Sequence, residues 1–286
     1  MRFTASLFGL AACSLLSVSH ATRAGVCGAE PSEDILAAAQ QLRLEEIDNA
    51  FESSRAQAKR LDIQTYFHVL SQTQEELDKV TDKALQEQID VMNQAFGRHN
   101  IWFNLAGTSR EVSILGASAY TYPSDLYTYR LHKGQYDDLN VYVMSSLGEF
   151  PGEGTLLGVA QFPKEVSPRS PAFYRDGVAI ISSVLPGGSF PNNGGGLTLV
   201  HEAGHWLGLF HTFQDGCGGQ GDQVDDTPAQ ADASPEDCSP KRDSCPNDPG
   251  NDPVHNYMDY SSEACQTEFT NGQITRIFSM WKRFRA

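Results

Sequence analysis

Residues 194–211 read GGGLTLVHEAGHWLGLFH, and the second half of this stretch has the spacing of a metal-binding helix. On a helix, His201 and His205 lie one turn apart and present their imidazoles on the same face. Glu202 follows the first histidine, so its carboxylate can reach a metal-bound water without being a ligand. The stretch therefore predicts a helix that binds a metal and carries a general base.

Gly208 and His211 extend this pattern. Glycine can end the helix with a positive φ at little cost, and the chain can then return His211 as a third ligand. Three imidazoles leave one tetrahedral zinc position open, which is typical of a catalytic site. Two histidines and a glutamate at this spacing also occur by chance, but the added glycine and third histidine make coincidence improbable. The apolar residues of the stretch are interpreted as core packing: Trp206, Leu207, Leu209 and Phe210.

Composition limits the partners. The 286 residues carry 36 acidic and 21 basic side chains, a formal net charge of −15, and the pI is near 4.8. Nucleic acids and anionic membranes need basic patches, so neither is expected as the partner. With 15 Phe, 10 Tyr and 3 Trp the chain can bury a core. We expect an acidic globular monomer.

The N-terminus has the features of a secretory signal. Arg2 precedes an apolar run at 5–18, and Ser19-His20-Ala21 places small residues before a cleavage site. The run is too short for a membrane anchor. We predict a signal peptide at 1–21 and a secreted, extracellular protein.

A polar segment follows at 22–60, with a loose helical pattern and no strand signal. It ends at Lys59-Arg60, which is either a processing site or an ordinary surface pair. We predict a pro-segment at 22–60 and a catalytic domain at 61–286.

The catalytic domain is expected to be α+β. A helix with its start at Thr81 and its end at Gly97 has apolar residues at helical spacing, and Thr270 with Gln273 forms a capping box before a final helix. A further helix is predicted at 124–133. Strands are predicted at 61–70, 101–105, 139–144, 154–162 and 177–184.

Residues 214–253 are rich in Gly, Asp, Pro and Cys and show no apolar period. A loop of this length needs covalent staples or a function. Cys217, Cys238, Cys245 and Cys265 favour two disulfides in an oxidising compartment. Three pairings are possible, and spacing does not choose among them.

The motif at 201–211 resembles the long zinc signature of the metzincin metallopeptidases, HExxHxxGxxH. Residues 256–261 (NYMDYS) resemble the metzincin Met-turn. Together with DDTPAQ in the loop and DPVHNYMDYSSEAC after it, the chain is similar to the pappalysin family, in particular to its small secreted members. The resemblance covers 61–286.

The resemblance implies a twisted mixed sheet with an active-site helix above a loop-rich, disulfide-stapled lower subdomain. It implies that zinc is bound by His201, His205 and His211, that Glu202 is the general base and acid, and that Tyr260 stabilises the tetrahedral intermediate. Met258 would support the zinc site as an apolar floor. The remaining implied features are the disulfides Cys217–Cys245 and Cys238–Cys265 and a calcium site drawn from Asp222, Asp225, Asp226 and Thr227. A solvated acidic loop is the alternative to the calcium site.

Cys27 suggests latency. A thiolate from a pro-segment can occupy the open zinc position of a secreted protease, although the context VCGAE lacks a familiar switch motif. The alternative is a free or mispaired thiol.

We expect a secreted zinc endopeptidase in which zinc-bound water attacks the peptide bond of a protein or peptide substrate. The strand at 154–162 is predicted to pair with the substrate backbone. Other interpretations are another metzincin branch, a non-catalytic binding module in which zinc organises the fold, and a toxin-like or adhesive protein.

Overall fold

The computed structural model describes residues 25–53, 60–119, 122–150, 154–234 and 238–286. The predicted signal peptide at 1–21 lies outside these ranges, as does Lys59 of the dibasic pair. Within the described ranges, no helix is both long and apolar enough to cross a bilayer.

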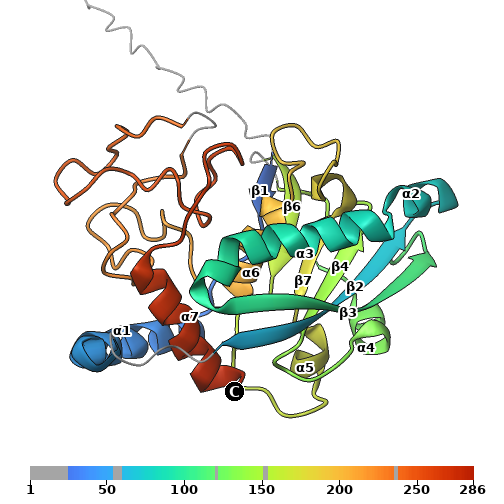
Figure 1. Ribbon diagram of the computed structural model, residues 1–286, viewed down its shortest axis with the longest axis horizontal. Helices are drawn as coiled ribbons and strands as arrows, with labels where there is room; N and C mark the ends of the chain where they lie inside the picture. The colour runs from blue at the N-terminus through green and yellow to red at the C-terminus, as the bar shows by residue number, and fades with distance from the viewer. Residues whose placement is uncertain (1–24, 54–59, 120–121, 151–153, 235–237) are drawn as a thin grey trace, which may run out of the picture.

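A mixed sheet forms the centre of the molecule (Figure 1). Its strands are β1 (Gly25–Cys27), β2 (Leu61–Ser71), β3 (Ile101–Val112), β4 (Leu139–Met144), β5 (Glu149–Phe150), β6 (Gly154–Ala160) and β7 (Val178–Ile181). The order is β1-β6-β7-β4-β2-β3, with β5 paired to β6. Strands β2, β3, β4 and β7 are parallel, whereas β6 runs antiparallel to β7. The predicted α+β class with a mixed sheet is confirmed.

The helices are α1 (Glu33–Ser53), α2 (Gln74–Lys79), α3 (Asp82–Phe96), α4 (Asp125–Leu131), α5 (Pro171–Arg175), α6 (Leu197–Trp206) and α7 (Asn271–Phe284), with 3-10 turns at Gly97–His99 and Ser182–Val184. Helix α3 follows the sequence prediction closely. The Thr81 hydroxyl accepts a hydrogen bond from the Ala84 amide and starts the helix. Its apolar face is buried against the sheet and against α6, so α3 supports the helix that carries the HEAGH motif.

Helix α6 carries the HEAGH motif and lies over β6 and β7. The helix ends at Trp206. The turn after it passes through Gly208, whose φ is +98° and where a Cβ would come within 2.6 Å of Met280. The turn therefore needs glycine both for its backbone angle and for the close approach of α7. After this turn the chain returns to the site at His211.

The lower region, which we define as residues 212–270, contains no helix or strand in the part of it that the structure describes. Two disulfides hold it, Cys217–Cys245 and Cys238–Cys265, which is the pairing that the family resemblance implies. The capping box of Thr270 and Gln273 then starts α7, as predicted.

The prediction that 22–60 contains no strand was wrong. Gly25–Cys27 forms β1, which pairs in parallel with β6 around Thr155–Gly158. A strand of three residues gives no alternating pattern, and its partner lies far along the chain. Strand β3 extends beyond the predicted 101–105 to Val112. Its second half alternates exposed residues with partly covered ones, so it lacks the buried apolar residues that mark a strand in the sequence.

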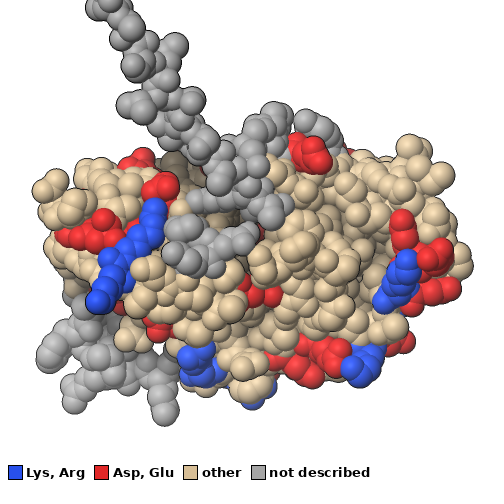
Figure 2. All heavy atoms as spheres, turned by 90° about the horizontal axis from the view of Figure 1, so that it is seen from above, with Lys and Arg blue, Asp and Glu red and all other residues tan. Residues whose placement is uncertain are grey.

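Basic side chains are scattered singly on the face shown in Figure 2, among more extensive acidic areas. They do not gather there into a patch that would suit a polyanion.

Candidate active site

Three histidines converge at the end of α6. His205 Nε2 lies 3.1 Å from His201 Nε2 and 3.1 Å from His211 Nε2. Tetrahedral zinc with nitrogen ligands about 2.0–2.1 Å away would set such atoms about 3.3 Å apart. The three ring nitrogens are therefore spaced as ligands of one ion.

The opposite ring nitrogens fix the tautomers. His201 Nδ1 lies 2.7 Å from the Tyr257 carbonyl, and His205 Nδ1 lies 2.7 Å from the Leu209 carbonyl. A carbonyl only accepts, so each Nδ1 carries the proton and each Nε2 presents a lone pair. Burial lowers the pKa of His201 to about 4 and that of His205 well below its ordinary value. Neutral imidazoles with lone pairs directed at one point fit a divalent metal.

Cys27 supplies a fourth group at the same point. Its Sγ and the ligand nitrogens of the three histidines all lie within 4.8 Å of one another. The Cys27 backbone is held in place by Tyr260, whose hydroxyl accepts from the Cys27 amide and donates to the Cys27 carbonyl, both at 3.1 Å. Burial raises the pKa of the Cys27 thiol well above its usual range, and the neighbouring Glu202 carboxylate adds to this shift.

Glu202 is fully buried beside this cluster. Its carboxylate lies next to the Cys27 thiol, and burial raises its pKa to about 8, against the lowering effect of that thiol. A Cβ at Gly158 of β6 would come within 2.6 Å of Glu202 Cγ, so the glutamate lies directly against the edge of the sheet. A buried carboxylate with a raised pKa is suited to exchange protons near neutral pH.

Met258 lies under the active-site helix. A Cβ at Gly204 would come within 2.4 Å of Met258 Sδ, so the sulfur packs against the helix between the two histidines of the motif. Asn256 Oδ1 accepts from the Met258 amide at 2.9 Å and fixes the turn. This position matches the apolar floor that the resemblance implies.

With this geometry described, comparison with known proteins decides the family. Residues 124–282 match the family Peptidase M43, described as Pregnancy-associated plasma protein-A. Extracellular metalloprotease 1 of Coccidioides posadasii is 41% identical over 288 residues, which cover 100% of this chain and 99% of that protein. This chain belongs to the pappalysin family.

Other similarities agree. The extracellular metalloprotease of Pyricularia oryzae is 44% identical over 285 residues, which cover 98% of this chain and 96% of that protein. Mature mirolysin of Tannerella forsythia, solved in complex with a cleaved peptide, matches with a TM-score of 0.63 and 27% identity, over 78% of this chain and 92% of that one. This pappalysin-family chain is thus a metalloendopeptidase with a metzincin fold. Its family implies a catalytic metal, and the three imidazoles fit one.

Sequence reasoning missed the residue that holds the start of the active-site helix of this pappalysin. The N-cap of α6 is Gly196, which has no side chain to satisfy the free amides of the first turn. Glu263 does so from the loop after the Met-turn: its carboxylate accepts from the Gly195 amide at 2.6 Å and from the Leu197 amide at 2.7 Å. Its negative charge also suits the helix N-terminus. An uncapped helix start preceded by glycines was the available signal.

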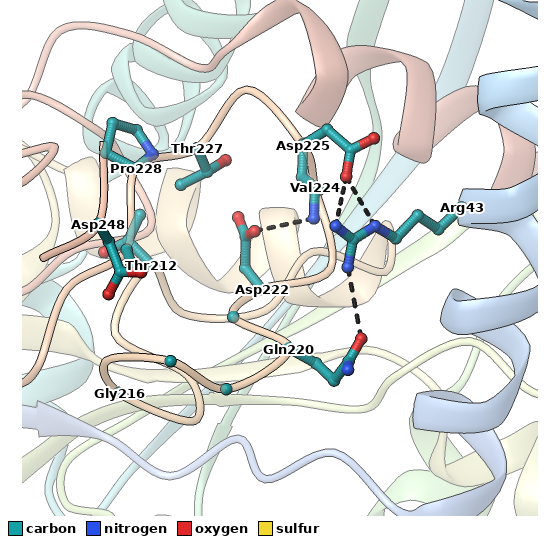
Figure 3. Close-up of a pocket in the computed structure, with 14 residues that line it drawn as sticks. Arg43, Thr212, Gly216, Gln220, Asp222, Val224, Asp225, Thr227, Pro228 and Asp248 are labelled. Atoms are coloured by element: carbon teal, nitrogen blue, oxygen red, sulfur yellow. Dashed lines mark hydrogen bonds and ion pairs between the residues drawn. The ribbon is translucent and has the colours of Figure 1, made fainter. Parts of the chain in front are cut away.

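The calcium candidates of the pappalysin loop do not all come together. Asp222, Asp225 and Thr227 line one small pocket of about 140 Å³ (Figure 3). Asp226 lies elsewhere, where its carboxylate accepts from the Gly272 amide at 2.8 Å, in the first turn of α7. Asp248 also lines the pocket, and the sequence analysis missed it because it follows Cys245, which the disulfide to Cys217 brings back.

Two oxygens in this pocket lack partners. Asp222 is 4% exposed, and neither its Oδ2 nor the Thr227 hydroxyl has a hydrogen-bond partner among the described residues. Burial raises the pKa of Asp222 to about 7. Asp225, in contrast, is engaged by Arg43 of α1 at 2.5 Å, as Figure 3 shows.

Proposed function

We propose that this chain is the zymogen of a secreted zinc endopeptidase, with a signal peptide at 1–21, a pro-segment at 22–60 and a catalytic domain at 61–286. His201, His205 and His211 hold the zinc. The convergence of three Nε2 ring nitrogens, each in a buried side chain, is the observation that carries the proposal. The extracellular names of its relatives support secretion.

When bound, zinc lowers the pKa of a coordinated water toward about 7 and polarises the scissile carbonyl. Glu202 takes a proton from the attacking water and gives it to the leaving amine, for which its buried carboxylate is suited. Tyr260 donates its hydroxyl hydrogen bond to the substrate carbonyl oxygen once Cys27 has left. The substrate lies along β6 in the place that β1 occupies in the zymogen, and backbone pairing binds it with little dependence on sequence.

The decisive experiment is cleavage of casein by the processed chain. We expect Glu202→Gln to keep the metal and the fold but to lose about 10²–10⁴-fold in kcat, and Tyr260→Phe to lose about 10²-fold. His205→Ala should lose the metal as well. Residual activity of Glu202→Gln close to that of the wild type would refute the proposed base, and activity that survives a zinc chelator would refute the metal mechanism.

We further propose that the Cys27 thiolate occupies the fourth zinc position and keeps the chain latent. Its Sγ lies with the three histidines, and Tyr260 fixes its backbone. A full chain with Cys27→Ser should hydrolyse a short peptide substrate faster than the wild-type zymogen at equal zinc content. Equal rates, with the pro-segment still attached to both, would contradict a role for the thiol.

We also propose that the pocket of Asp222, Thr227 and Asp225 binds calcium. Hard oxygen ligands fit this ion, among them Asp222 Oδ2, the carboxylate oxygen that the Val224 amide does not engage. Calcium should raise the melting temperature of the wild type and of Asp226→Asn, but not that of Asp222→Asn. A wild-type melting temperature that does not change when calcium is added would refute the site.

A further inference from the structure

Helix α1 packs against α7 and against Phe210, the residue before His211. Figure 1 shows it beside α7, whereas β1 lies at the β6 edge of the sheet. On α1, an apolar stripe packs against Phe210 and Met280, with Phe162 and Phe284 at its margin. The stripe consists of Ile35, Ala38, Ala39 and Leu42, all buried. This contact is made without the metal or the thiol.

Charged contacts surround the apolar stripe. Arg276 of α7 is 1% exposed, and its guanidinium donates to Glu46 of α1 at 2.9 Å and to the Gln223 carbonyl at 2.8 Å. Arg43 of α1 is paired with Asp225. We call the partners of α1 (Phe210, Gln220, Asp225, Arg276, Met280 and Phe284) the α1 docking surface. Loss of α1 would leave the Arg276 charge without this carboxylate, which favours retention of the helix.

The helix keeps Cys27 close to the zinc site. Only residues 28–32 separate Cys27 from the start of α1, and these span at most about 20 Å when extended. Along the way the Gly28 amide donates to the Gly158 carbonyl at 3.0 Å. A docked α1 therefore presents the thiol at an effective concentration of about millimolar or more, even when each contact alone is weak.

None of these contacts depends on the covalent link between α1 and β2. We infer that the α1 docking surface binds the pro-segment as a separate chain after cleavage near Lys59-Arg60, so that the cut enzyme stays latent. Activation then needs a second event that separates Cys27 from α1 or destroys the helix. This inference rests on the proposed function and adds the regulation of its site.

The test uses the full zinc-loaded chain in which the recognition sequence of a site-specific protease replaces residues 54–59. After complete cutting, gel filtration reports whether the pro-segment stays bound, and a peptide substrate reports activity. We expect co-elution and less than about one tenth of the activity reached once the pro-segment has been digested away.

Two matched pairs of variants locate the interaction. Leu42 is 6% exposed and Leu44 is 63% exposed on the same helix. After the cut, Leu42→Asp should release the pro-segment and raise activity about tenfold, whereas Leu44→Asp should behave like the wild type. Glu46→Gln should weaken retention, whereas Glu33→Gln, at an exposed position at the start of the same helix, should not.

Activity that appears in step with the cut in the wild type, with separate elution of the pro-segment, would overturn the inference. If a substitution prevents folding of the zymogen, the wild-type result still decides. A chain that keeps its zinc but stays inactive after the pro-segment has been digested would refute the proposed function instead, and co-elution would still report on the docking surface.

Discussion

The sheet part (residues 60–210) and the lower region (212–270) both contribute to the site, but different interactions hold them together. In the sheet part, backbone pairing and apolar packing place His201, Glu202 and His205 on a helix. In the lower region, two disulfides and buried polar groups fix the loop that carries Met258 and Tyr260. For example, Asp259 Oδ1 accepts from the Ser234 amide and from Gln230, both at 3.0 Å. The helix and sheet position the first two histidines, whereas individual disulfides and hydrogen bonds position the residues around them.

The largest effect on stability is expected at the back of the sheet part. Arg285 pairs with Asp176 through two bonds of 2.8 and 3.0 Å and donates to the Trp206 carbonyl, with both charged side chains almost fully buried. Arg285→Ala leaves the buried charge of Asp176 without its counter-ion and, among the described residues, with only the Trp206 indole N–H donating to it. We expect a loss of about 3–5 kcal/mol in the free energy of unfolding.

Urea denaturation of Arg285→Ala and of the exposed Lys282→Ala would measure this. Equal stability of the two variants would show that the sheet part does not depend on its buried ion pair.

The corresponding experiment in the lower region is to remove the Cys238–Cys265 disulfide. The two cysteines have a sequence separation of 27, so replacing both by serine should cost about 3.5 kcal/mol through the entropy of the unfolded chain. Removal of Cys217–Cys245, with a separation of 28, should cost about the same. Thermal unfolding of both double variants tests this, and a melting temperature unchanged in either would show that the polar bonds suffice there.

The pH dependence of stability tests a histidine that is buried inside the sheet part. His68 is buried between Ser109 and Asn140, and burial lowers its pKa to about 4. The unfolded chain binds the proton at about pH 6.5, so the folded state loses relative stability as the pH falls from about 6.5 to 4, by about 3 kcal/mol in total.

His68→Gln removes this proton uptake. The difference in unfolding free energy between wild type and variant should therefore shrink or reverse across that pH range. A difference that stays constant with pH would contradict the assignment.

The smallest effect lies where the lower region passes into α7. The Thr270 hydroxyl accepts from the Gln273 amide at 3.0 Å, so Thr270→Ala should cost about 1 kcal/mol. Thr275→Ala, in the middle of the same helix, should cost less, because its hydroxyl only bonds back to the Asn271 carbonyl. Chemical denaturation should rank the two variants in this order, and the reverse order would argue against the cap.

The same contrast explains what the sequence could predict. Periodicity and caps located α3 and α7, and the HEAGHWLGLFH spacing located the histidines that the structure brings together. Asp248 and Glu263 could not be found in this way, since a disulfide and a loop bring them to their places. Strand β1 was missed for a similar reason: its three residues gain order only by pairing with β6, about 130 positions away. The calcium candidates were grouped by closeness in sequence, and Asp226 shows that adjacent carboxylates can face different neighbours.

The order of the bridged cysteines decides what a single proteolytic cut does to the protein. The loops closed by Cys217–Cys245 and Cys238–Cys265 overlap, because Cys238 lies inside the first loop and Cys245 inside the second. A single break of the main chain anywhere between Cys217 and Cys265 therefore leaves the two fragments covalently joined by at least one bridge. Self-digestion at one exposed loop bond, such as one next to Lys241, cannot detach Tyr260 from the histidines. The crossed bridges thus keep the molecule in one covalent piece after a single cleavage in this loop.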